Sequence, residues 1–303
     1  MPTMEYLNAR PGSGTQPRVV LDTDTFNEID DQFALAYLLR ATDRVSAEAV
    51  YAAPFHNDRS SSAGDGMLKS YQEIRRLLQR LNMDDFPSFS GSEHFLTESG
   101  QLTSETVPTS AAVGDLIERA LTATHSDRLN IVAIGALTNI ASALLIEPEI
   151  AERCTVIWLG GHHPNWPHNK EFNLQGDISA TRVVFDSGVP LYVVPCNGVA
   201  SHLLTSATEL ARYLELDDPL CRFLYDRFVE YGPADGVWTK EIWDVGAVAW
   251  LTLPDAVESY TLATPRIAED GSYIHDPRRT QCRFAYKLNR DAVFKDLYER
   301  LRP

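Results

Sequence analysis

Short apolar runs that alternate with helical patterns constrain the fold of this chain more than any other feature. Five runs are typical of buried strands, at residues 18–22, 45–53, 129–135, 155–160 and 191–195. Amphipathic patterns typical of helices fill most of the gaps, at residues 30–41, 67–81, 110–124, 137–146 and 178–187. Such alternation predicts an α/β fold with an open, mostly parallel sheet and helices on both faces.

The last third of the chain has a different pattern. It predicts helices at residues 207–214, 219–231 and 244–251, a strand-like tail at 265–288 and a closing helix, with a hairpin signal at Asp270-Gly271. Apolar residues are spread evenly along the 303 residues and make up 44% of them, which is enough for one full core. We therefore predict one Rossmann-like domain at residues 18–303, after a flexible leader at residues 1–17 that is rich in Gly, Pro and small polar residues.

The formal net charge of −15 limits the possible partners. A chain this acidic repels phosphate backbones and anionic lipids, which argues against nucleic-acid and membrane-surface binding and favours a neutral small molecule. The amino-terminal residues have no apolar stretch that could act as a signal or anchor, and no later run approaches about 18 apolar residues. We expect a cytoplasmic protein. Its four cysteines show neither metal-ligand spacing nor disulfide density, and are expected to be buried thiols.

Five acids crowd the turn between the first strand and the first helix. In a parallel sheet, ligands bind beyond the carboxyl ends of the strands, so this turn lies where a site is expected. One acid would suffice to cap the helix. Several carboxylates close together repel one another, and the usual resolutions are a raised pKa on one of them or a bound hard divalent cation such as Ca2+. The acids of the cluster are Asp22, Asp24, Glu28, Asp30 and Asp31.

Two other motifs compete for the same segment. The calcium loop of EF-hands needs acids at alternating positions, a glycine and a distal glutamate, and residues 22–33 lack that order. The strand-end Asp-x-Asp of Mg2+-dependent dehalogenase-type phosphatases would make Asp22 the nucleophile and Asp24 its acid/base partner. Phe26 stands where that pattern has Thr or Val, but the alternative stays open.

Four ordered segments form a recognisable series. The first is Asp22-Thr23-Asp24 followed by Asp30-Asp31. The later segments are Ile134-Gly135-Ala136-Leu137-Thr138-Asn139-Ile140-Ala141, then Gly160-Gly161 with Asn165, Glu171-Phe172-Asn173 and Asp177, and finally Trp243-Asp244-Val245-Gly246-Ala247-Val248-Ala249. In this order they resemble the motifs of the nucleoside hydrolases, the inosine-uridine-preferring family. The resemblance spans about residues 18–250, and it implies the nucleoside hydrolase fold and hydrolysis of ribonucleosides to free base and ribose.

The resemblance also implies roles for individual residues. The calcium ligands would be Asp24, Asp31, the main-chain carbonyl of Thr138 and Asp244, with Asp24 also the general base toward the attacking water and Asp244 part of the catalytic centre. The residues that hold the ribose hydroxyls would be Asp30, Asn165, Glu171 and Asn173. The chemistry agrees, because cleavage of a ribosyl C–N bond passes through an oxocarbenium-like state that anionic and amide groups stabilise. A homodimer or homotetramer is implied as well.

Two departures from the family pattern bear on the substrate. The linker Thr25–Ile29 is longer than usual and has no glycine, so Asn27 and Glu28 are candidates to point into the pocket beside Asp30. Trp243 stands where many members carry a histidine that protonates the leaving base. An aromatic residue at this place in purine-preferring members stacks on the base, so Trp243 favours purine nucleosides.

The missing proton donor needs a replacement, and a histidine suits that role. His162 and His163 follow Gly160-Gly161 in the expected ribose-binding loop, and either could supply the proton. We assign His163 to catalysis and His162 to substrate binding. Asn57, after the second strand run, is expected to touch the sugar or base. A non-catalytic nucleoside- or sugar-binding protein that lost its proton donor is the remaining alternative.

Overall fold

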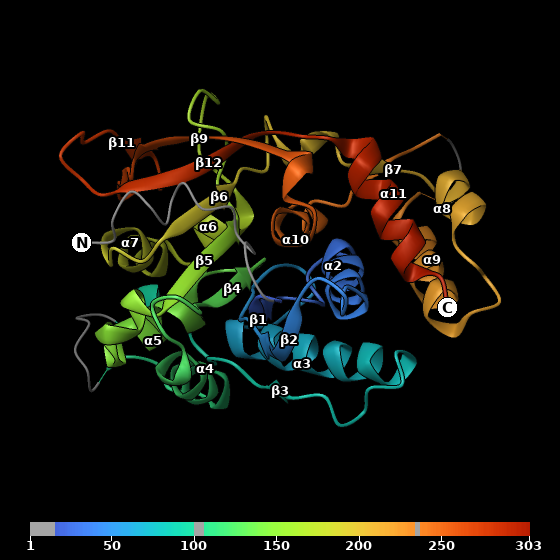
Figure 1. Ribbon diagram of the computed structural model, residues 1–303, viewed down its shortest axis with the longest axis horizontal. Helices are drawn as coiled ribbons and strands as arrows, with labels where there is room; N and C mark the ends of the chain where they lie inside the picture. The colour runs from blue at the N-terminus through green and yellow to red at the C-terminus, as the bar shows by residue number, and fades with distance from the viewer. Residues whose placement is uncertain (1–15, 100–105, 234–236) are drawn as a thin grey trace.

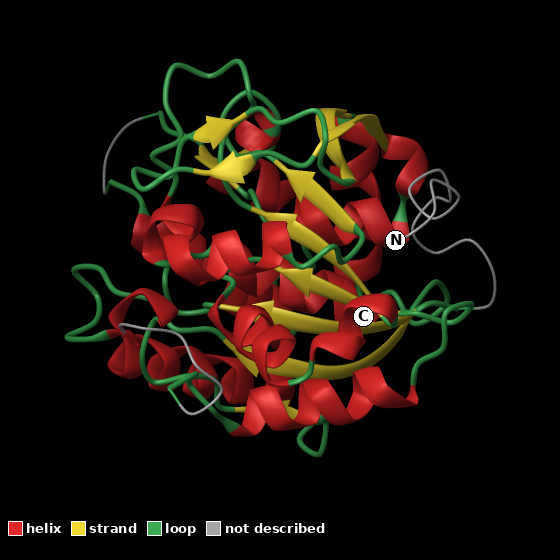
Figure 2. Cartoon of the chain, turned by 90° about the vertical axis from the view of Figure 1, so that its left-hand side faces the viewer, coloured by secondary structure: helices red, strands yellow, loops and turns green. Residues whose placement is uncertain are grey.

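The computed structural model describes residues 16–99, 106–233 and 237–303. In this part of the chain the main sheet has eight strands, in the order β3-β2-β1-β4-β5-β6-β12-β9. Every neighbouring pair is parallel except β12 and β9, which are antiparallel. Their bounds are β1 Arg18–Thr23, β2 Ser46–Ala52, β3 Ser88–Phe89, β4 Leu129–Ala133, β5 Cys154–Leu159, β6 Leu191–Val194, β9 Val257–Ala263 and β12 Gln281–Leu288. Figure 2 shows the strands stacked through the middle of the molecule between helices.

Helices cover both faces of this sheet (Figure 1). One face carries α2 (Asp30–Arg40), α3 (Ala63–Arg80), α9 (Pro219–Tyr231), α10 (Val245–Thr252) and α11 (Arg290–Leu301). The other carries α4 (Ala111–Thr122), α5 (Thr138–Ile146) and α7 (Ile178–Asp186). The short helices are α6 (Phe172–Gly176) and α8 (Ala207–Tyr213), with 3-10 turns at Leu96–Ser99, Pro148–Glu152, Ala200–His202 and Pro254–Ala256. Two small antiparallel sheets pair β7 (Leu204–Thr205) with β8 (Lys240–Glu241), and β10 (Arg266–Ile267) with β11 (Tyr273–Ile274).

Alternate residues of each strand pack into two separate cores, one on each face of the sheet. On β1, Val19 and Leu21 pack in the core with α2, whereas Val20 packs in the core with α4 and α5. Since successive side chains of a strand point to opposite faces, a strand covered on both faces is apolar throughout. This is why the predicted strands are continuous apolar runs.

The predicted single-domain α/β fold is confirmed. All five predicted runs form strands, β1, β2, β4, β5 and β6, and the intervening helices follow. The hairpin signal is also confirmed, because Gly271 lies between β10 and β11 with a φ of +83°. The carboxyl-terminal tail is more than a strand-like extension, since β12 joins the main sheet beside β6 and β9 begins before residue 265. Residues 1–15 of the expected leader lie outside the described residues.

Within the described ranges, no helix has the length and apolar character that crossing a membrane would require.

Candidate active site

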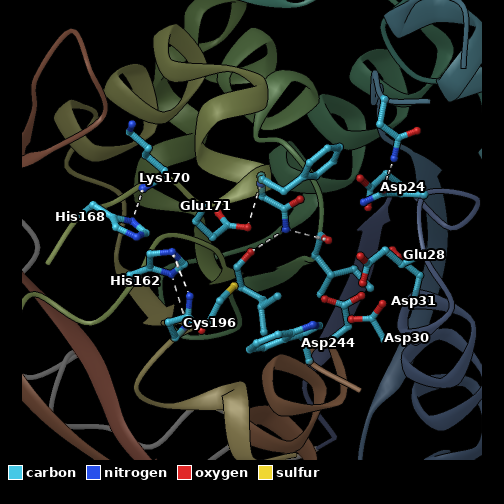
Figure 3. Close-up of a pocket in the computed structure, with 18 residues that line it drawn as sticks. Asp24, Glu28, Asp30, Asp31, His162, His168, Lys170, Glu171, Cys196 and Asp244 are labelled. Atoms are coloured by element: carbon cyan, nitrogen blue, oxygen red, sulfur yellow. Dashed lines mark hydrogen bonds between the residues drawn. The ribbon is translucent and has the colours of Figure 1, made fainter. Parts of the chain in front are cut away.

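A pocket of about 460 Å³ opens where the parallel strands end at their carboxyl termini. Figure 3 shows two chemically distinct walls, with Asp24, Glu28, Asp30, Asp31 and Asp244 on one side and His162, His168 and Lys170 on the other. Its volume lies in the range of small-ligand pockets. The arrangement suits a ligand of moderate size with hydroxyl groups at the acidic wall.

The acidic wall is assembled from two distant parts of the chain. Asp30 and Asp31 begin α2 directly after the turn that follows β1, and Asp244 immediately precedes α10. One carboxylate oxygen from each of these three residues lies within 4.8 Å of the others, and all three side chains are buried. Asp24 lines the same wall, is 1% exposed, and has an Oδ2 atom without a hydrogen-bond partner.

The helix that begins beside each of these carboxylates does not use it as a cap, so the carboxylates are available for a ligand. Asp244 is positioned to cap α10, but its side chain makes no capping hydrogen bond, and α2 and α5 also begin without a side-chain cap. Every other α-helix in the described ranges has one. An uncapped amino terminus presents unpaired N–H groups and a positive dipole end, which favours nearby negative charge. Thr23 Oγ1 donates to Asp31 Oδ1 at 2.5 Å and fixes that side chain.

Burial and mutual repulsion make these acids hard to ionise unless a cation is present. Burial is the largest cause of the raised pKa values in this cluster. It raises the pKa of Asp31 to about 8 and that of Asp30 to about 6. It also raises the pKa values of Asp24 and Asp244. Neighbouring carboxylates add to the effect on Asp24, Asp31 and Asp244. A hard divalent cation would reverse this preference. The clustered oxygens and the unpartnered Asp24 atom therefore fit such an ion.

We expect the stability that a divalent cation adds, measured here with Ca2+, to increase with pH. The pKa values of Asp30 and Asp31 are raised from 3.8 in the folded protein, so the metal-free fold keeps protons that the unfolded chain releases. Stability without metal should therefore fall as pH rises from about 4 to about 8. Calcium should raise Tm by about 5 °C at pH 8 and only about 1 °C at pH 5.5, measured by calorimetry against EDTA. An equal rise at both pH values would contradict the cation site.

Glu171 and Asn173 lie at the start of α6, in the segment that follows β5, and both are buried. Glu171 caps α6, accepting hydrogen bonds from the backbone N–H groups of Gly161 at 2.7 Å and of Asn173 and Leu174 at 2.9 Å. Asn173 Nδ2 donates to the carbonyls of Ile134 and Leu159 at 3.2 and 3.1 Å. Both residues line the pocket, and their polar groups are fixed before a ligand arrives. The amide oxygen of Asn173 is the group that remains to accept from a ligand hydroxyl.

Two predicted site residues in the loop after β5 lie outside the pocket. Asn165 is exposed and does not line the pocket, and its backbone N–H donates to His163 Nδ1. His163 also lies outside the pocket, where its ring packs 6.2 Å from that of Tyr260. The loop turns away after His162 because the buried Asn169 accepts the His162 N–H at 2.6 Å.

His162 is the buried histidine of the pocket. The backbone N–H of Asn197 donates to its Nδ1 at 3.3 Å, and the side-chain Nδ2 of Asn197 lies 3.2 Å from its Nε2, so Asn197 contacts both ring nitrogens. Burial and the neighbouring His168 lower the pKa of His162 below its ordinary value. The His168 ring lies 5.4 Å away, and His168 lines the same wall.

The other predicted residues take varied positions. Trp243 and Asn57 line the pocket, as do Asn27 and Glu28 from the lengthened linker, and Asn57 Nδ2 donates to Asn27 Oδ1 at 2.6 Å. Thr138 is buried at the start of α5, where its Oγ1 donates to Asp177 Oδ2 at 2.8 Å.

Asp22 does not line the pocket. Its Oδ2 accepts from Asn139 Nδ2 at 2.8 Å, and the other oxygen, Oδ1, is buried without a partner. A dehalogenase-type phosphatase needs this residue as an accessible nucleophile. The position of Asp22 therefore argues against that alternative.

Sequence reasoning missed Cys196 and Lys170, which line the pocket, and Lys240 behind it. Cys196 directly follows β6, so the strand-end rule could have found it. Burial and the adjacent Glu171 raise the pKa of its thiol well above the ordinary value. No local pattern marks Lys170 or Lys240.

A buried carboxylate cluster beside a small-ligand pocket, at the carboxyl end of a parallel sheet, defines the class of α/β enzymes that work with a metal ion on hydroxyl-bearing substrates. The sequence model of the inosine-uridine preferring nucleoside hydrolases matches residues 19–295, and the chain belongs to this family. It is therefore an enzyme, a nucleoside N-ribohydrolase, as the sequence predicted.

Individual relatives agree with this assignment. The chain is 26% identical over 262 residues to the pyrimidine-specific ribonucleoside hydrolase RihA of Salmonella paratyphi A, covering 78% of this chain and 80% of that protein. Two solved structures share the fold. They are a plant nucleoside hydrolase, PpNRh1 (22% identity, 94% and 98% coverage, TM-score 0.75), and a purine-preferring ribonucleoside hydrolase from Gardnerella vaginalis (18%, 94% and 98%, 0.74).

Proposed function

We propose that the enzyme hydrolyses the N-glycosidic bond of ribonucleosides with a Ca2+ ion held by Asp24, Asp31, Asp244 and the main-chain carbonyl of Thr138. The observation that carries the proposal is the buried cluster of carboxylates, beside which one Asp24 oxygen has no protein partner. Bound there, the ion would supply a Lewis acid that orients the ribose diol and lowers the pKa of a water. Asp30 belongs to the cluster and is free to bind the ion or a ribose hydroxyl.

Asp24 is the proposed general base. Its carboxylate is buried, has one oxygen without a protein partner, and lines the pocket beside Asp31. A carboxylate in that position can accept a proton from an attacking water when the cation keeps it ionised. The proton leaves the water as the C–N bond breaks and the water oxygen bonds to the anomeric carbon, giving ribose and the free base.

Glu171 and Asn173 are the proposed sugar-holding groups opposite the acids. Each is fixed by hydrogen bonds to the backbone, so little side-chain freedom is lost when the sugar binds. Their anionic and amide oxygens also stabilise positive charge that develops on the ribosyl ring.

Trp243 supports a preference for purine nucleosides, because its half-buried ring lines the pocket and offers a stacking surface. The relatives point in both directions, since RihA is named pyrimidine-specific and the Gardnerella enzyme purine-preferring. The test is kcat/KM for inosine, adenosine, guanosine, uridine and cytidine. A purine-to-pyrimidine ratio of about ten or more supports the preference, and a ratio below one contradicts it.

His162 takes the role of leaving-group donor that the sequence assigned to His163. Burial lowers its pKa, so the ring is mostly neutral near pH 7 and acts on the departing base as a hydrogen-bond donor, while the leaving nitrogen takes its proton from solvent. We expect His162→Ala to lower kcat about 10²-fold and His163→Ala to change it less than about twofold. Steady-state kinetics on both variants, with folding checked by circular dichroism, decide the point. Equal effects at the two positions would refute the assignment.

The cytoplasmic location and the homodimer or homotetramer stay predictions of the sequence. So does the flexible leader at residues 1–17.

A further inference from the structure

A partly buried ion pair adjoins the pocket and has no part in the proposed chemistry. Lys240 Nζ donates to Glu28 Oε2 at 2.6 Å, and the Tyr231 hydroxyl donates to Glu28 Oε1 at 3.1 Å. The Lys240 side chain is 11% exposed and that of Glu28 is 35% exposed. Glu28 lines the pocket, and it comes from the linker that is longer than the family pattern. We call Glu28, Tyr231 and Lys240 the clamp.

The clamp holds a cation against the aromatic wall of the pocket. Lys240 Nζ lies 5.6 Å from the centre of the Trp243 ring and 5.7 Å from that of Tyr231. Both distances are within the range of cation–π attraction. The ammonium therefore lies in cation–π range of the tryptophan that is proposed to stack on the base.

The backbone around Lys240 is fixed independently of its charge. Lys240 pairs with Thr205 in the β7–β8 ladder, and the Ile242 N–H donates to the Leu203 carbonyl at 2.8 Å. Loss of the ammonium should therefore leave the main chain in place and act on the side chains that it contacts. Those side chains are Glu28, Tyr231 and Trp243, and the ammonium also attracts the Asp30 carboxylate of the acidic wall.

We propose that the Glu28–Lys240 pair, with Tyr231, fixes the orientation of the Trp243 ring and so sets how the enzyme discriminates between nucleobases. This inference rests on the proposed function. Burying an ammonium is costly, and Glu28, two aromatic rings and the charge of Asp30 offset that cost beside the pocket wall. A stacking surface discriminates between ligands when its orientation is fixed before binding. Lys240 and Glu28 are thus positioning residues that act through Trp243.

The test compares Lys240→Met and Glu28→Gln with wild type on purine and pyrimidine nucleosides. Both variants keep the length of the side chain and remove its charge. We expect KM for the purine substrate to rise about five- to tenfold relative to KM for the pyrimidine substrate. The lost charge also faces Asp30, but that effect is common to both substrates and leaves the ratio unchanged. The purine-to-pyrimidine ratio of kcat/KM then falls about fivefold, and Lys240→Arg, which keeps a cation, restores most of it.

A double-variant cycle separates positioning from general stabilisation. In a Trp243→Ala background, Lys240→Met should cause no further change in the base ratio, because the residue that it positions is gone. Independent, additive effects of the two substitutions would overturn the proposal. A lowered Tm with an unchanged base ratio would also overturn it, because the pair would then be structural.

The chain offers a matched control on its surface. Glu258 accepts from Lys287 Nζ and from the Tyr286 hydroxyl, each at 2.7 Å, in the same chemical arrangement as the clamp. This pair is exposed and lies on β9 and β12 at the edge of the sheet, away from the pocket. Lys287→Met should leave the base ratio at its wild-type value.

A binding experiment distinguishes failure of the clamp proposal from failure of the proposed function. If wild type released ribose from no nucleoside, the clamp would be tested by quenching of tryptophan fluorescence on titration with inosine and uridine, with Trp243→Ala as the blank. Weaker inosine binding by Lys240→Met, with uridine unchanged, supports the clamp. Identical binding curves for wild type and variant overturn it.

Discussion

Replacing Asp24 by asparagine should lower kcat about 10³-fold while the protein stays folded. Asparagine keeps the shape of the side chain and an oxygen that can face the cation, but its amide cannot accept a proton from water. Because the substitution also removes one charge from the proposed calcium site, kcat is compared at saturating calcium, where the loss should persist. Stopped assays for ribose measure kcat, and calcium titration calorimetry measures the calcium affinity.

Asp22→Asn is the matched control for this experiment. Asp22 precedes Asp24 by two residues on the same buried strand end, but it lies outside the pocket. An asparagine there can still accept the hydrogen bond that Asp22 Oδ2 accepts from Asn139. We expect most of the activity to remain. If the two substitutions reduced kcat equally, Asp24 would have no special role as a base.

Removing the charge of Asp244 should weaken calcium binding about 10²-fold, because charge count largely sets the affinity of an oxygen site for Ca2+. Its carboxylate belongs to the cluster of three and makes no capping bond that could explain its burial otherwise. Turnover by Asp244→Asn should be low at micromolar calcium and should recover at millimolar calcium. Turnover by Asp24→Asn should not recover, and this contrast separates holding the ion from taking the proton.

Asp218→Asn provides a comparison at another helix start. Asp218 caps α9 with hydrogen bonds from the backbone N–H groups of Leu220 and Cys221, a role that asparagine performs equally well. Calcium affinity should stay at the wild-type value. A similar loss in both variants would mean that the effect of Asp244→Asn is one of stability and not of metal binding.

Local pattern predicts the sheet up to β6 because strands buried on both faces are apolar along their whole length. The place of β12 could not be predicted in this way. Its pairing with β6 joins segments about 90 residues apart in the chain, and the sequence of neither segment indicates which strand it pairs with. The side chains of β12 also vary in burial along the strand, so it resembles an ordinary edge strand.

The acidic wall could be predicted because family motifs and strand ends both pointed to it, and Asp31 and Asp244 do converge. The loop after Gly161 could not. Its path depends on Asn169, whose side chain accepts a hydrogen bond from the His162 backbone N–H. His163 and Asn165, which follow, lie outside the pocket. Motif spacing carries no information about such a contact. Lys240 was missed for the same reason, since its importance lies in what surrounds it.

Ribose release with and without Ca2+ tests the central claim most directly. The enzyme would be stripped with EDTA, assayed on inosine, adenosine, guanosine, uridine and cytidine, and assayed again after Ca2+ is restored. We predict release from at least one nucleoside with Ca2+, background release after chelation, and full recovery on adding Ca2+ back. Release that chelation leaves unchanged, or no release from any of the five with Ca2+ present, would contradict the account.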